Sequence, residues 1–221
     1  MTDHLTPESL RPAPPVETEE GPLETAVSVL TRPVPTLRRV TQLAPVGWAI
    51  GLVAVLQFLS GIAAGLATPA FEGILGPSPD MGAVSVVALG IFSSIAGLIG
   101  LALGAAILQG VALLLKGTGT YKGLLAGLGF AQLPYIFNIP AQLLVVAGPG
   151  GAFLSLLVAF SLFIWSFALA TIAVRENHGF STGRAVATML IPLGVAIALV
   201  VILAIALVAL VAGVMTQMSA G

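Results

Sequence analysis

Long apolar stretches alternate with short polar gaps along most of this chain. Five such runs cover residues 43–68, 82–115, 123–147, 152–174 and 184–215. A transmembrane helix needs about 20 mostly apolar residues to cross a hydrocarbon core about 30 Å thick, and each run is long enough. The pattern predicts an all-α membrane protein, built as a five-transmembrane-helix bundle over residues 43–218.

Positively charged side chains lie in alternate gaps between these runs. They precede the first run, occupy the second gap and flank the fourth gap: Arg32, Arg38, Arg39, Lys116, Lys122, Arg175 and Arg184. The first gap carries only the acidic Glu72 and Asp80, and the third gap carries no charge. Because short loops rich in Lys and Arg stay in the cytoplasm, we predict a cytoplasmic N-terminus and an outer C-terminus.

The N-terminal 22 residues differ from the rest of the chain in composition. Residues 1–22 combine five prolines with several glutamates and contain no aromatic residue. Such a segment buries too little apolar area to offset the entropy of ordering it. The composition therefore predicts a disordered, acidic, proline-rich tail.

Residues 23–42 predict short amphipathic segments that lie on the inner membrane surface. Their apolar residues recur at helical spacing, and Pro33 interrupts the pattern. Arg32, Arg38 and Arg39 are candidate lipid-headgroup contacts, because basic residues near an anionic leaflet are attracted to it. The alternative is that these arginines only set the topology.

The third run is irregular because two prolines interrupt it among polar amides. Gln132, Pro134, Asn138, Pro140 and Gln142 fall within eleven residues of one another. Each proline removes a backbone donor and clashes with the preceding turn, so the pattern predicts a kinked or broken helix. These five residues either line a wet cavity or bend the helix around its neighbours.

Composition narrows the chemistry that this chain supports. Hydrophobic residues make up 57% of the sequence and charged residues 8%, against about 25% charged in a typical soluble domain. The runs hold no ionisable residue at depth, which argues against a proton-driven carrier. Cysteine is absent, and the two histidines, His4 and His178, lie outside the runs. We therefore predict no enzymatic activity, no metal or other cofactor and no nucleic-acid partner.

The most distinctive polar segment lies between the fourth and fifth runs. It covers residues 174–185 and includes Glu176-Asn177-His178-Gly179-Phe180-Ser181 and Arg184. Gly179 can adopt the left-handed conformation that closes a helix, so the segment predicts a turn between two helices. The basic inner face is a candidate partner-docking surface, formed by Lys116, Lys122, Arg175, His178 and Arg184.

The same segment carries a family resemblance. The helix that ends in Arg175, the His178–Ser181 turn, Arg184-Ala185 and the following helix with Pro192 resemble the Yip (Ypt-interacting protein) domain family as found in bacteria. The Ala131-Gln132-Leu133-Pro134 stretch and the Arg32-Pro33 lead also resemble it. The resemblance implies a five-helix membrane domain with a cytoplasmic N-terminus, and it offers no catalytic residue.

Three hypotheses follow for the function. The first is a non-enzymatic adaptor or accessory subunit of a complex in the bacterial cytoplasmic membrane, with a membrane-protein partner or a second copy. Eukaryotic Yip relatives resemble trafficking adaptors, and bacterial ones are implied to be accessory proteins, some associated with export. The second is a channel or facilitator for a small neutral solute beside the broken third helix. The third is lipid organisation by the segments before residue 43.

Overall fold

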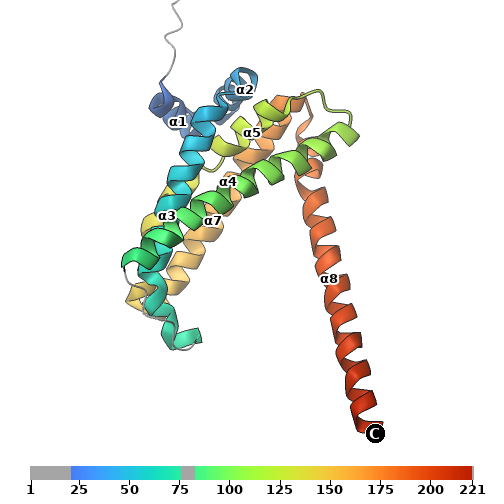
Figure 1. Cartoon of the computed structure of the whole chain (residues 1–221). Coiled ribbons are helices and arrows are strands. Elements are labelled where there is room, and N and C mark those ends of the chain that lie inside the picture. The colour runs from blue at the N-terminus through green and yellow to red at the C-terminus, as the bar shows by residue number, and fades with distance from the viewer. Residues whose placement is uncertain (1–20, 76–82, 221) are drawn as a thin grey trace, which may run out of the picture.

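The described part of the chain is almost entirely helical. A computed structural model describes residues 21–75 and 83–220. Five helical stretches in it are long and apolar enough to cross a bilayer, so the predicted five-helix membrane fold is confirmed. In Figure 1 the N-terminal helices and the end of the last helix lie at opposite ends of the molecule.

Two short helices lead into the membrane domain. Helix α1 covers Pro22–Thr31 and α2 covers Pro33–Leu43. The chain turns between them at Arg32, because Pro33 has no N–H to continue the first helix. Helix α2 packs against α5 and α7, and its Leu37 side chain is fully buried there.

Helices α3 and α4 pack together more extensively than any other pair of described helices. Helix α3 covers Val46–Leu75 and α4 covers Ala83–Leu114. A Cβ at Gly61 would lie 2.8 Å from the Cα of Gly90, so only glycine permits this approach. Ser94 adds a cross-helix hydrogen bond, in which its hydroxyl donates to the carbonyl of Ala54 at 2.8 Å.

The third apolar run is divided into four short helical pieces. They are α5 (Tyr121–Phe130), the 3₁₀ helix η2 (Leu133–Phe137), α6 (Asn138–Leu143) and the 3₁₀ helix η3 (Leu144–Ala147). Pro134 lies in the first turn of η2, where a missing donor costs least. The pieces cross the bundle between α3 and α7.

The last two helices differ in how they pack. Helix α7 covers Pro149–His178 and lies against α2, α5 and α6. Helix α8 covers Thr182–Ala220 and contains Pro192. It contacts α4 and α7 near its beginning and then leaves the bundle, as Figure 1 shows. Its described side chains beyond Leu193 are exposed.

The core of the bundle lies towards the end that carries α2 and the α7–α8 turn. Fully buried side chains in this core include Leu37 of α2, Val53 of α3, Leu124 of α5 and Val174 of α7. Lipid can solvate apolar surface on the outer faces of the helices, so this cluster is where the described helices bury apolar side chains against one another.

Candidate functional site

The end of the bundle that carries α2 gathers all the basic residues singled out by the sequence. The α4–α5 loop, the C-terminus of α7 and the start of α8 meet there. Lys116, Lys122 and Arg184 are exposed, whereas Arg175 is partly covered. Among the candidate lipid contacts, Arg32 and Arg38 are exposed, and Arg39 is partly covered.

Helix α7 ends at the α7–α8 turn, where Gly179 adopts the left-handed conformation. Gly179 has φ +65°, and its N–H donates to the carbonyl of Arg175. The N–H of Phe180 donates to the same carbonyl at 3.0 Å. This geometry confirms the turn predicted from the sequence, because glycine adopts positive φ without steric cost.

His178 is buried beneath the α4–α5 loop. Only 3% of the residue is exposed, so its ring supports the surface from below and is not part of it. Its Nδ1 accepts a hydrogen bond from the N–H of Gly119 at 3.0 Å, and an accepting nitrogen carries no proton. The ring also stacks on Phe180, with the two centroids 5.4 Å apart.

The α4–α5 loop is held in place by hydrogen bonds to three elements. The amide of Gln109 on α4 donates to the carbonyl of Gly119 at 2.8 Å. The amide of Asn177 on α7 donates to the carbonyl of Thr120 at 3.0 Å. The Thr120 hydroxyl in turn caps α5 by accepting from the N–H of Gly123 at 3.1 Å. The loop is therefore a constrained connection.

Arg184 joins the two loops from the outer side. Its guanidinium lies 4.4 Å from the centre of the Phe180 ring and donates to the carbonyl of Leu115. The first contact is a cation–π interaction, worth about 0.5–1 kcal/mol at an exposed site. Arg184 thus fixes the beginning of α8 against the end of α4.

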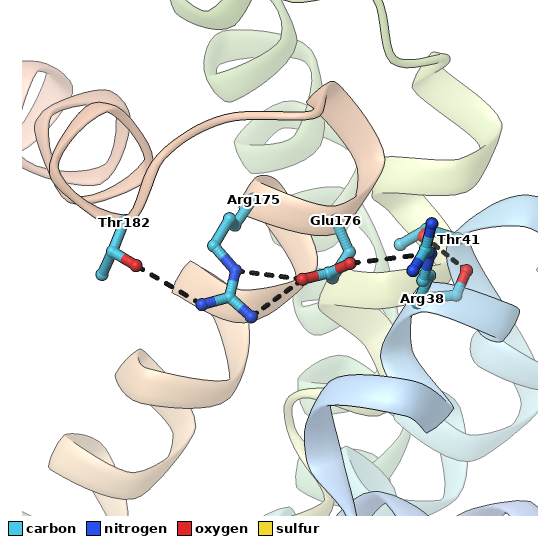
Figure 2. Close-up of polar contacts among 5 residues, drawn as sticks. All are labelled: Arg38, Thr41, Arg175, Glu176 and Thr182. Carbon is cyan, nitrogen blue, oxygen red and sulfur yellow. Dashed lines mark hydrogen bonds and ion pairs between the residues drawn. The ribbon is translucent and has the colours of Figure 1, made fainter.

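A small ionic cluster ties α2, α7 and α8 together, as Figure 2 shows. Glu176 accepts from Arg175 Nε at 3.0 Å and from Arg175 Nη2 at 2.8 Å. Its second oxygen lies 4.0 Å from Arg38 Nε on α2. Arg175 Nη1 reaches the Thr182 hydroxyl at the start of α8, 3.4 Å away. Glu176 therefore neutralises part of the positive charge at this end.

A hollow of about 470 Å³ lies beside the broken third helix. Gln132, Asn138 and Gln142 line it, together with residues of α3 and α4. Pro134 is buried and Pro140 is exposed, and neither forms part of its wall. The prolines interrupt the helix, and the amides face the space beside it.

A second hollow of about 370 Å³ adjoins the first, and Gln57, Gln132 and Tyr135 line both. The second hollow extends between α4 and α7 to Ser166 and Met189. Gln57, an isolated polar residue in a long apolar helix, was not identified from the sequence. A glutamine halfway along an apolar run is a signal that could have identified it.

Sequence reasoning also missed the residues that organise the polar end. Glu176, Asn177 and Phe180 lie in the distinctive segment, but only tertiary contacts reveal what each one holds. Within the described ranges, no group of three His, Cys, Asp or Glu side chains could hold a metal ion.

Comparison with known proteins shows the family. A family model described as the Yip1 domain matches residues 27–205, which is most of the chain. The chain therefore belongs to the Yip1 domain family, and the resemblance found in the sequence is confirmed. No curated protein and no solved structure gives a significant match.

Proposed function

We propose that this Yip1-family membrane protein is a non-enzymatic adaptor or accessory subunit, with its α2 end in the cytoplasm of a bacterial cell. The gathering of basic residues at that end supports the orientation. The partner is a membrane protein, or a second copy, that presents an acidic cytoplasmic segment to Lys116, Lys122 and Arg184.

The observation that carries the proposal is that exposed lysines flank a loop whose conformation is fixed by hydrogen bonds from beneath. Lys116 and Lys122 flank the α4–α5 loop, which His178 and Asn177 hold from beneath. A surface that is already ordered loses less conformational entropy when it binds a partner. A loop with this many internal hydrogen bonds is better suited to recognition than an unconstrained one.

Charge complementarity supports an acidic partner. Glu176 is only 16% exposed and is engaged by Arg175, so it offers little negative charge to the outside. The exposed cations therefore dominate the surface of this end. Such a patch accelerates encounter with an acidic segment and disfavours basic ones.

Crosslinking in native membranes tests the proposal. We expect the Lys116→Gln/Lys122→Gln variant to lose most of the crosslinked partner, because both lysines are exposed and neither side chain forms a hydrogen bond or ion pair with the described residues. Arg32→Gln is the matched control, since Arg32 is also exposed but lies on the α1–α2 turn. The proposal is wrong if the protein is a partner-free monomer at native expression. It is also wrong if the double lysine variant and Arg32→Gln crosslink equal amounts of the partner.

A facilitator for a small neutral solute is the second candidate. The hollow beside the broken helix favours it, because Gln132, Asn138 and Gln142 give that space a polar wall. Glycerol flux into liposomes is the measurement, and alanine at these three positions should change the rate. Flux equal to that of protein-free liposomes would exclude this candidate without affecting the adaptor proposal.

A further inference from the structure

The larger hollow has an unusually polar wall for a space among apolar helices. Four amides line it, Gln57, Gln132, Asn138 and Gln142, and the Tyr135 side chain lies beside them. Ser60 and Ser93 add two hydroxyls from α3 and α4. Among the described residues, no acidic or basic side chain forms part of this wall.

One polar atom of this wall, and one in the adjoining hollow, have no hydrogen-bond partner within the described part of the chain. Asn138 Oδ1 is buried and accepts no hydrogen bond from the described residues. In the adjoining hollow the same is true of Ser166 Oγ, on a residue only 8% exposed. Lipid tails cannot hydrogen-bond, so an unsatisfied polar group at membrane depth is costly. A buried amide oxygen and a buried hydroxyl in adjoining hollows point to an occupant that forms hydrogen bonds.

The packing of α3 on α4 keeps Gln57 at the wall. A Cβ at Gly97 would collide with Cγ of Gln57 and lie 2.9 Å from its Cδ, so the glutamine rests directly on the glycine. A Cβ at Gly61 would likewise lie 2.6 Å from Ser93 Oγ. The two helices thus hold polar side chains at defined positions before any ligand arrives, as a preorganised site requires.

We infer that this hollow binds a neutral, hydroxyl-bearing molecule at membrane depth. Amides and hydroxyls donate and accept, so a glycerol-like group with several hydroxyls satisfies them best. The described residues of the wall carry no charge, so a phosphate or carboxylate would find no counter-charge among them and is disfavoured. A volume of about 470 Å³ lies within the range of small-molecule sites, about 300–1,000 Å³. The group belongs either to a free polyol or to a neutral lipid such as diacylglycerol, and the site stands independently of the adaptor role.

Photo-crosslinking of the full chain in nanodiscs tests the inference with two probes, a short diazirine-bearing diol and a diazirine-bearing diacylglycerol. We expect at least one probe to label peptides from the wall, and competition by glycerol or by dioleoylglycerol then identifies the source. Dioleoylphosphatidic acid should not compete, because its headgroup is charged. Labelling of the wall by neither probe overturns the inference.

Matched variants show whether the polar wall is responsible. Gln57→Leu and Gln132→Leu should each weaken labelling about tenfold, because each removes hydrogen bonds to the ligand while keeping similar bulk. Gln42→Leu is the control, a glutamine exposed on α2 and outside both hollows. Melting temperatures of all three variants, measured alongside, separate loss of binding from loss of fold. Equal labelling of folded Gln57→Leu and Gln42→Leu proteins would refute the site.

Discussion

Helices α5 and α8 are both parts of apolar spans, yet one is buried inside the protein and the other is mostly exposed. Every residue of α5 from Gly123 to Phe130 is buried. Helix α8 belongs to the most apolar of the five spans and is the least covered by protein. Apolar character therefore measures how readily a helix enters lipid, and it does not measure how tightly the helix packs against its neighbours.

The difference arises from small side chains and from polar anchors. The glycines of α5 lie against neighbouring helices: a Cβ at Gly127 would lie 2.9 Å from Ala173 Cβ, and one at Gly129 would lie 2.8 Å from Ala49 Cβ. In α8, a Cβ at Gly194 would meet nothing within 4 Å. Close approach needs small residues on one helix and a complementary surface on the next, and of these two helices only α5 has both.

Truncation of a leucine gives the largest expected contrast between the two helices. Leu124→Ala in α5 should lower the free energy of unfolding by about 2–5 kcal/mol, because it opens a cavity at a fully buried position. Leu199→Ala in α8 should change it by less than about 0.5 kcal/mol, because that side chain is already exposed. Unfolding in mixed micelles, followed by tryptophan fluorescence, measures both. Equal losses would contradict the contrast.

Adding a methyl group should give the next largest effect. A Cβ at Gly123 would collide with the backbone carbonyl of Thr41 and with Asn177 Oδ1, so Gly123→Ala should cost about 1–3 kcal/mol. Gly194→Ala should instead stabilise α8 by about 0.5–1 kcal/mol, because alanine favours a helix interior. Melting temperatures that move in opposite directions are the expected result. If Gly123→Ala melts no lower than the parent, the close packing of α5 on α2 is wrong.

The smallest expected effect lies at the joint where α8 leaves the bundle. Glu176→Gln removes the carboxylate between Arg175 and Arg38 and should cost at most about 1 kcal/mol, because Arg38 is 66% exposed and well solvated. The cost should diminish at high salt, which screens the charges. Glu24→Gln is the control, because it removes an exposed carboxylate from the first turn of α1, away from Arg175 and Arg38, and should cost less than Glu176→Gln. A salt-independent loss would show that Glu176 acts mainly through packing.

Much of the fold could be predicted because a bilayer is a demanding solvent. Every backbone polar group must be satisfied inside the segment that crosses it, so a long apolar run has to be helical. The five spans and the family resemblance both followed from the sequence and were confirmed. The left-handed end at Gly179 was also predictable, because its signal is local.

The arrangement of the polar end could not be predicted in the same way. His178 was grouped with exposed cations, yet it lies buried against Gly119, which is 59 positions away in the chain. Gln57 and Gln132 come from different helices, and no periodicity connects them across one hollow. Contacts between distant segments depend on helix rotation and crossing, which a bilayer leaves open.

The sequence alone determined the solvent of this protein, the number of its spans, its family and the gathering of basic residues in alternate gaps, because each depends on local composition. Tertiary structure decided which helix is enclosed and which faces lipid, how Glu176 and His178 hold the polar end together, and where four amides line one hollow. Those features arise where small residues let particular helices approach closely, and such approach is a property of pairs of segments and not of either one alone.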